Sequence, residues 1–314
     1  MTEPLTPEGG TDAATGAPSD LVEVRGLVKT YPLRNAWGRA RGTVRAVDGV
    51  DLAIRRGETL ALVGESGSGK STLGRCILQM EEPTDGSVLY GGVDLTALPR
   101  GRRAGFHRSM QVIFQDPFSS LNPHRTALQN VAEPLQALEP GADARARALE
   151  ALAAVGIDGD AVHRRPRAFS GGQRQRIVIA RAIAVRPAFV VCDEPLSALD
   201  MSIQAQVTEL LLRLQRELQL TYLFISHDLS VVREIATRTA VMHRGRIVEL
   251  GPTESVFASP QHPYTQRLLD AALAIDPAEA RRRLERISTR PEPDSADHDG
   301  TALAEVAPGH FARR

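Results

Sequence analysis

The sequence predicts an α/β fold built around a mainly parallel β-sheet. One observation is a set of four apolar runs without polar alternation, at residues 60–63, 112–114, 189–192 and 222–225. Such runs are typical of strands buried on both faces by helices. The second observation is that polar residues follow each run. Ligands of open α/β sheets bind at the carboxyl ends of the strands, so we expect one site at that edge.

The remaining elements are expected at the following places in the chain. Strands are predicted over residues 21–31, 45–54 and 58–63, and a loop containing Pro32, Gly38 and Gly42 over residues 32–43. Helices are predicted over residues 72–80, 143–155, 170–185 and 203–218. In the last of these, apolar residues recur at the spacing of a core-facing helical stripe.

Composition excludes several classes of protein. Hydrophobic residues make up 42% of the 314 residues and charged residues 24%, which argues against a disordered, collagenous or disulfide-rich chain. No apolar run reaches the roughly 18 residues of a membrane-spanning helix. The first twenty residues lack the basic and apolar regions of a secretory signal, so we expect a cytoplasmic chain. Residues 1–20 and 288–314 are expected to be disordered tails, the first of them acidic.

The charged residues balance, with 38 basic and 38 acidic side chains. The chain therefore lacks the net basic field expected of a nucleic-acid-binding protein, and no nucleic-acid partner is predicted. Only two of the basic residues are lysines, Lys29 and Lys70, so we expect each of them to have a specific role at its position. Cys76 and Cys192 lie in apolar stretches and are expected to be small buried residues.

Residues 64–71 match the phosphate-loop pattern G-x-x-x-x-G-K-[ST] between a predicted strand and a predicted helix. Backbone N–H groups of such a loop face a triphosphate, and Lys70 would reach its β- and γ-phosphates. The Ser71 hydroxyl would bind Mg²⁺. A glycine-rich turn that ends in lysine by chance is the alternative. The residues expected to bind the nucleotide here are Gly64, Ser66, Gly67, Gly69, Lys70, Ser71 and Thr72.

Asp193 and Glu194 end an apolar run, where a second set of carboxylates for Mg²⁺ would be placed. Asp193 would orient the ion through water. Glu194 would act as the general base for the attacking water. The alternative is an acidic strand end that contacts only solvent.

His227 and Gln115 follow two other runs of the same predicted edge. A single histidine is often structural, but this position favours a role in fixing the γ-phosphate and the attacking water. The uncharged amide of Gln115 could contact Mg²⁺ or water. We therefore predict Glu194, His227 and Gln115 as catalytic residues, and Ser71, Gln115 and Asp193 around the metal.

Ser170 and Gln173 form a capping-box pattern at the start of a predicted helix. A cap alone does not require Gly171 and Gly172, since each glycine costs about 1 kcal/mol inside a helix. Paired glycines are consistent with close approach of another phosphate to this helix start. A second protomer could supply that phosphate.

With these motifs in this order, residues 21–270 resemble an ABC-type ATPase subunit. Phe169 replaces the leucine that usually precedes the signature Ser170–Gln173. Asp200 resembles the last residue of the D-loop, and Tyr31 the aromatic that stacks on adenine, although a packing role for Tyr31 is the alternative. The resemblance implies a P-loop nucleoside triphosphatase core, an N-terminal antiparallel β subdomain and a helical signature subdomain inserted at about 118–180.

The runs 114–123, 200–206 and 262–265 are similar to the oligopeptide/dipeptide permease ATPases, and the predicted loop at 32–43 to their F-type subunit. This resemblance implies a nucleotide-binding domain at 21–258 and a C-terminal extension at 259–287. It further implies ATP and Mg²⁺ as cofactors and a position at the cytoplasmic face of the membrane. The implied partners are a second ATPase subunit, identical or paralogous, two membrane permease subunits and, indirectly, an extracytoplasmic solute-binding protein.

The implied function is ATP hydrolysis that energises import of peptides or a related small solute. A non-transport ABC ATPase of DNA repair or regulation is the alternative. A repair ATPase would need a long coiled-coil or zinc insertion, which the chain lacks. The cargo, which could be a peptide or nickel, stays open, as does the choice between homodimer and heterodimer.

Overall fold

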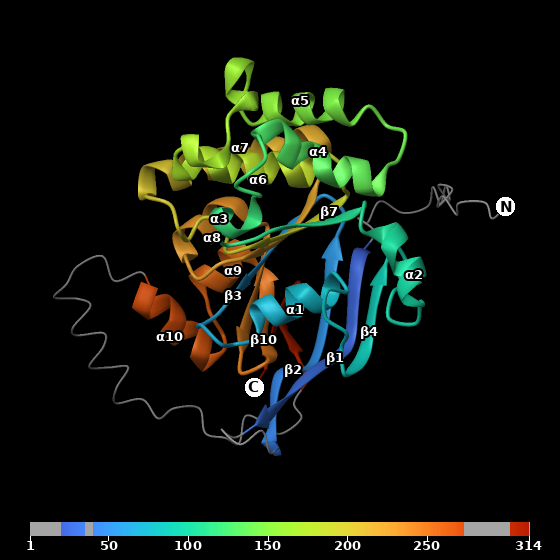
Figure 1. Ribbon diagram of the computed structural model, residues 1–314. Coiled ribbons are helices and arrows are strands. Elements are labelled where there is room, and N and C mark those ends of the chain that lie inside the picture. The colour runs from blue at the N-terminus through green and yellow to red at the C-terminus, as the bar shows by residue number, and fades with distance from the viewer. Residues whose placement is uncertain (1–19, 35–39, 273–301, 314) are drawn as a thin grey trace, which may run out of the picture.

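The computed structural model describes residues 20–34, 40–272 and 302–313. Within these residues the strands form two sheets, one antiparallel and one mainly parallel (Figure 1). The strands are β1 (Asp20–Arg34), β2 (Ala40–Arg55), β3 (Thr59–Val63), β4 (Asp85–Tyr90), β5 (Val93–Asp94), β6 (Met110–Ile113), β7 (Phe189–Asp193), β8 (Thr221–Ile225), β9 (Arg238–His243), β10 (Arg246–Pro252), β11 (Ala304–Ala307) and β12 (His310–Ala312).

The larger sheet has the order β11-β12-β10-β9-β3-β8-β7-β6 in the described chain. The five strands β9, β3, β8, β7 and β6 run parallel to one another. The pairs β9–β10, β10–β12 and β11–β12 are antiparallel. The four apolar runs correspond to β3, β6, β7 and β8, which confirms the predicted parallel core. β6 is only partly buried, because it lies at the edge of the sheet.

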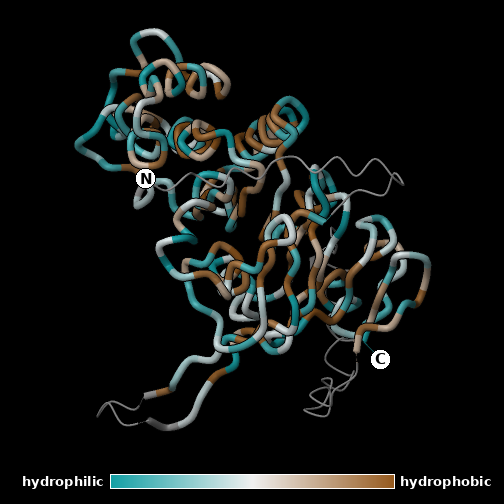
Figure 2. The backbone as a smooth tube through the Cα atoms, turned by 90° about the vertical axis from the view of Figure 1, so that its right-hand side faces the viewer, coloured by the Kyte–Doolittle hydropathy of each residue, from teal (hydrophilic) through white to brown (hydrophobic). Residues whose placement is uncertain are grey.

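Alternate residues of the central strands enter two hydrophobic cores, one on each face of the sheet. Leu60 and Leu62 of β3 pack with the antiparallel sheet and α1 (Lys70–Ile77), whereas Ala61 and Val63 pack with the helices on the opposite face. Many segments rich in hydrophobic residues run through the middle of the molecule (Figure 2). Both cysteines are free and buried, as expected.

The other helices are α2 (Arg100–Arg103), α3 (Pro117–Ser120), α4 (Ala127–Leu138), α5 (Ala144–Ala154), α6 (Gly171–Ile183), α7 (Met201–Leu218), α8 (Leu229–Ile235), α9 (Thr253–Ala258) and α10 (Pro263–Ala272). Short 3₁₀ turns are η1 (Ala104–Phe106), η2 (Gly159–His163) and η3 (Pro166–Ala168). Helices α4, α5, α6 and α7 gather at one end of the molecule, away from the antiparallel sheet (Figure 1). No helix in the described ranges is both long and apolar enough to cross a membrane.

The smaller sheet has the order β2-β1-β4-β5. The sequence predicts a loop over 32–43, but β1 continues to Arg34 and β2 begins at Ala40, so this prediction is wrong for the described part of the segment. Pro32 pairs with Thr43 and Leu33 with Gly42. The pairing of β1 with β4 ends at Val28. Beyond this residue, β1 and β2 form a two-stranded ribbon that projects from the body (Figures 1 and 2). Proline is tolerated there because one side of the strand has no partner to bond.

The expected acidic tail at 1–20 lies outside the described residues except for Asp20, the first residue of β1. The expectation of a disordered tail at 288–314 is wrong for residues 304–312. There β11 and β12 form a hairpin that extends the larger sheet, with β12 paired to β10. The turn uses Gly309 at φ +68°, a conformation that glycine adopts without strain. Strands this short have too few apolar residues to show a pattern.

Candidate functional site

The phosphate loop connects the carboxyl end of β3 to the start of α1. Its backbone at Gly64 has φ +148°, and a Cβ there would lie 2.2 Å from the Met242 carbonyl oxygen of β9. At Gly69, with φ +107°, a Cβ would lie 2.0 Å from the carbonyl oxygen of Ala46. Glycine is therefore required at both positions by close backbone packing. Around Gly67 the space is open, with φ +83°, and the neighbouring Ser66 is exposed.

Lys70 is buried at the first position of α1. Its Nζ donates hydrogen bonds to the carbonyl oxygens of Gly64 at 2.7 Å and Glu65 at 2.8 Å. Burial lowers the pKa of Lys70, an effect that the carboxylates of Glu194 and Asp193 oppose. The ammonium group is thus held inside the curl of the loop as a compact positive charge.

Ser71 and Asp193 meet where α1 faces the end of β7. The Ser71 hydroxyl donates to Asp193 Oδ1 at 2.8 Å. Asp193 is buried, and its burial raises the pKa of the carboxyl group despite the Ser71 hydrogen bond. A hydroxyl and a carboxylate so placed are oxygen ligands of the kind that Mg²⁺ prefers.

Glu194 lies between Gln115 and His227 at the same edge of the sheet. Gln115 Nε2 donates to Glu194 Oε2 at 3.1 Å, and His227 Nδ1 lies 3.4 Å from the same oxygen. His227 is 60% exposed and Glu194 only 20%, so the carboxylate is sheltered while the imidazole faces solvent. Glu194 also has φ +48°, a strained conformation for a residue with a Cβ. Strained backbone conformations of this kind occur often at functional sites.

Tyr31 lies on β1 beside the start of α1. Its hydroxyl donates to the Glu81 carboxylate and contacts the side chain of Thr72. Burial and the Glu81 bond raise the pKa of Tyr31 to about 12. The structure thus places Tyr31 beside Thr72 of the phosphate-loop helix α1.

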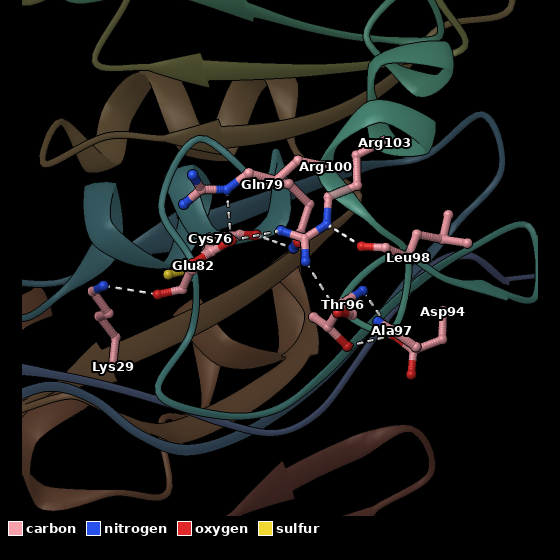
Figure 3. Close-up of polar contacts among 10 residues, drawn as sticks. All are labelled: Lys29, Cys76, Gln79, Glu82, Asp94, Thr96, Ala97, Leu98, Arg100 and Arg103. Carbon is pink, nitrogen blue, oxygen red and sulfur yellow. Dashed lines mark hydrogen bonds and ion pairs between the residues drawn. The ribbon is translucent and has the colours of Figure 1, made fainter.

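Lys29, the second of the two lysines, supports this region. Its Nζ lies 5.1 Å from the centre of the Tyr31 ring and donates to the Glu82 carbonyl oxygen at 2.7 Å. Figure 3 shows Lys29 pointing to Glu82, whose carboxylate accepts hydrogen bonds from Arg100 at 3.1 Å and Arg103 at 3.2 Å. Lys29 thereby ties β1 to the segment that follows α1.

The signature residues form a group of their own. Ser170 and Gln173 make the capping box in both directions, at 3.3 and 3.0 Å, so that part of the sequence interpretation is confirmed. A Cβ on Gly172 would lie 2.5 Å from Ile203 Cγ2, whereas one on Gly171 would make only an ordinary contact. Packing of α6 on α7 within one chain thus explains Gly172, and only Gly171 leaves room at the helix start.

Asp200 begins the neighbouring helix α7, where its carboxylate accepts from Ile203 N at 3.0 Å and Ser202 Oγ at 2.7 Å. These bonds lower the pKa of Asp200. Its hydrogen bonds, like those of Ser170 and Gln173, stay within its own segment and do not reach the phosphate loop.

Sequence reasoning missed contacts that the loop makes with the C-terminal half of the chain. The Glu65 N–H donates to the Tyr264 hydroxyl at 2.9 Å, and Gly245 N donates to the Ser68 carbonyl oxygen at 2.9 Å. The sequence singles out the run 262–265 only by its resemblance to a family. Nothing in its residue pattern indicates which part of the chain Tyr264 contacts.

Comparisons with known proteins show which family this chain resembles. Residues 47–197 match the ABC transporter family, and residues 248–303 match the oligopeptide/dipeptide transporter C-terminal region. The oligopeptide transport ATP-binding protein OppF of Bacillus subtilis is 46% identical over 289 residues, which are 91% of this chain and 95% of OppF. The glutathione import ATP-binding protein GsiA of Salmonella paratyphi A is 43% identical over 303 residues, which are 94% of this chain. This chain spans about half of GsiA, 48% of its length.

The fold also matches solved structures. The ATP-binding cassette MJ0796, in a dimeric post-hydrolysis state with ADP and Pi, is 31% identical with a TM-score of 0.66, covering 74% of this chain and 98% of that one. The matched families span both the phosphate loop and the segment that carries Tyr264. The chain therefore belongs to the ABC transporter ATPases, within the group that carries the oligopeptide/dipeptide transporter C-terminal region.

Proposed function

We propose that this chain is the ATP-binding and ATP-hydrolysing subunit of an importer for oligopeptides, dipeptides or a related small solute such as glutathione. The observation that carries the proposal is the meeting of four strand ends around the phosphate loop. There Ser71 bonds to Asp193, and Glu194 contacts both Gln115 and His227. The similarity to OppF and GsiA supports peptides as the cargo class.

The residues present fit MgATP. Open space at Gly67, the buried ammonium of Lys70 and the exposed Ser66 suit a chain of phosphates at the start of α1. Ser71 and Gln115 would hold Mg²⁺, and Asp193 would orient its water ligands. Tyr31 would stack on the adenine, with Thr72 beside it. When bound, MgATP supplies the phosphoanhydride bond that is hydrolysed.

Three kinds of side chain of this protein would then have separate roles in hydrolysis. Glu194 accepts the proton of the attacking water, since its carboxylate lies beside Gln115 and His227 at the carboxyl ends of the strands. His227 and Gln115 orient that water through their contacts with the same carboxylate oxygen. Lys70 offsets negative charge that develops on the phosphates.

Two such chains, identical or paralogous, would close head to tail, so that Ser170–Gln173 and Asp200 of one chain complete the site of the other. Two membrane permease subunits would take up the closing motion at the cytoplasmic face of the membrane, and an extracytoplasmic binding protein would deliver the solute. The helical group between β6 and β7 is the part we assign to the permease contact.

The test is purification of the tagged full chain from membranes of its own cells. Copurification of integral membrane subunits, with peptide uptake that is lost in Glu194→Gln, is the expected result. Purification without membrane proteins, and uptake unchanged in Glu194→Gln, would instead favour the non-transport alternative.

A further inference from the structure

One peptide unit of the phosphate loop is held at both ends. The carbonyl oxygen of Gly64 accepts from Lys70 Nζ at 2.7 Å, and the N–H of Glu65 donates to the Tyr264 hydroxyl oxygen at 2.9 Å. Both groups belong to the same planar peptide. The two hydrogen bonds therefore fix the orientation of that plane, one from inside the loop and one from α10.

Tyr264 is itself held rigidly. Its side chain is 2% exposed, and its ring lies 3.9 Å, centre to centre, from the ring of His243 at the end of β9. Burial raises the pKa of Tyr264, so its hydroxyl stays neutral at physiological pH. Its backbone N–H donates to His262 Nδ1 at 3.1 Å. An acceptor on so immobile a side chain restrains its donor strongly.

A buried carboxylate holds the segment that carries Tyr264. Glu249 of β10 is fully buried and accepts from the N–H groups of Gln261 and His262, both at 2.9 Å. Its Oε1 also lies 2.7 Å from His310 Nε2 of β12. A buried polar group is stable only where it is hydrogen-bonded, as this carboxyl group is. Glu249 thus joins the C-terminal hairpin to the start of α10.

We propose that Tyr264 is a positioning residue of the nucleotide site, and that residues 261–264 at the start of α10, held by Glu249, set the shape of the phosphate loop. This inference rests on the proposed function, in which residues 64–71 hold the phosphates of ATP. Tyr264 touches no reacting atom. It acts through the Gly64–Glu65 peptide, which in turn restrains Lys70.

The test compares Tyr264→Phe with Tyr222→Phe in the nucleotide-free full chain. Both changes remove one buried tyrosine hydroxyl and keep the ring. Tyr222 bonds to the Leu211 carbonyl oxygen, remote from the loop, and serves as the matched control. We expect amide hydrogen exchange in the peptides covering residues 62–73 to quicken in Tyr264→Phe only. Equal exchange in wild type and Tyr264→Phe would overturn the proposal.

A second readout is the affinity for MgATP and MgADP, with circular dichroism to confirm that each variant is folded. Loss of one hydrogen bond should weaken both nucleotides by about 2- to 10-fold in Tyr264→Phe and leave Tyr222→Phe unchanged. Unchanged affinity in Tyr264→Phe would refute a role in nucleotide binding. Failure of the wild-type chain to bind MgATP would refute the proposed function alone, since hydrogen exchange still decides whether Tyr264 positions the loop.

Discussion

Gln115 and Glu194 are 79 residues apart in the chain, yet Gln115 Nε2 donates to Glu194 Oε2 at 3.1 Å. The amide follows β6 and the carboxylate follows β7, two neighbouring parallel strands. His227, after β8, lies 3.4 Å from the same oxygen. The parallel order of the strands thus gathers the groups proposed for hydrolysis on one carboxylate.

Glu194→Gln should leave ATP binding intact and lower hydrolysis by about 10²- to 10⁴-fold, because it removes the proposed general base. A closed dimer with bound ATP should then accumulate. Nucleotide binding by fluorescence and phosphate release measure the two effects separately. A folded variant that has lost ATP binding would count against this role.

Lys70→Arg should weaken nucleotide binding by about tenfold or more although the charge is kept. The ammonium sits between two loop carbonyl oxygens at 2.7 and 2.8 Å, where a wide, forked guanidinium does not fit. Calorimetric titration with MgATP checks this. Unchanged affinity and turnover would mean that Lys70 lies outside the phosphate cradle.

Asp193→Asn should stabilise the nucleotide-free chain at pH 7 and slow hydrolysis by about 10- to 100-fold. Burial raises the pKa of Asp193, so the folded chain binds its proton more tightly than the unfolded chain does. That contribution to stability is present at low pH and is lost as the pH rises through the raised pKa. The gain from Asp193→Asn, measured by urea unfolding, should therefore shrink as the pH falls.

Asp48→Asn is a control outside the site, because the pKa of Asp48 is lowered whereas that of Asp193 is raised. Burial acts to raise the pKa of Asp48, but Arg246 and Arg45 outweigh it and leave a lowered pKa. This variant should lose stability at neutral pH, and the loss should vanish as the pH falls below the ordinary aspartate range. The same pH trend in both variants would contradict the assignment for Asp193.

Gly64→Ala should lower the free energy of unfolding by at least about 1–3 kcal/mol from backbone strain alone. The added Cβ would also lie 2.2 Å from the Met242 carbonyl oxygen, which forces β9 and the loop apart. Gly101→Ala, where a Cβ meets nothing within 4 Å, is the matched control and should cost nothing. Similar stability of the two variants in urea would refute the close packing.

Ser170→Arg should spare ATP binding by the isolated chain and block hydrolysis in the closed dimer. Loss of the cap alone predicts only about 1 kcal/mol of destabilisation. Thr126→Ala, which removes the other capping box at α4, measures that cost away from the site. Near wild-type activity of Ser170→Arg would contradict a shared site.

Dimers that contain two different variant chains test the shared site more directly. If Ser170–Gln173 of one chain serves the nucleotide of the other, a pair of Ser170→Arg and Lys70→Ala chains would carry both lesions in one composite site and leave the other site intact. Partial recovery of hydrolysis is expected if one intact site can turn over alone. In a heterodimer, the partner subunit must carry the second lesion.

The central sheet could be predicted because unbroken apolar runs followed by polar residues are typical of strands buried on both faces. The gathering of Gln115, Glu194 and His227 could be predicted because the carboxyl ends of parallel strands meet at one edge. The hairpin at 304–312 could not, since it depends on pairing with β10 and on the His310–Glu249 contact. The Glu65–Tyr264 bond spans 199 residues and leaves no local pattern. The sequence suggests a phosphate near Gly172, but its close neighbour is Ile203, a contact that arises only when α6 packs on α7.

Equilibrium binding of MgATP to the purified full chain, beside its Lys70→Ala variant, tests the central claim most directly. It requires none of the proposed partner subunits. We expect one ATP per wild-type chain, and binding at least about 100-fold weaker in a folded Lys70→Ala variant, since a buried charged contact to phosphate is lost. Equal affinity of the two chains, or no binding by the wild type, would contradict the account.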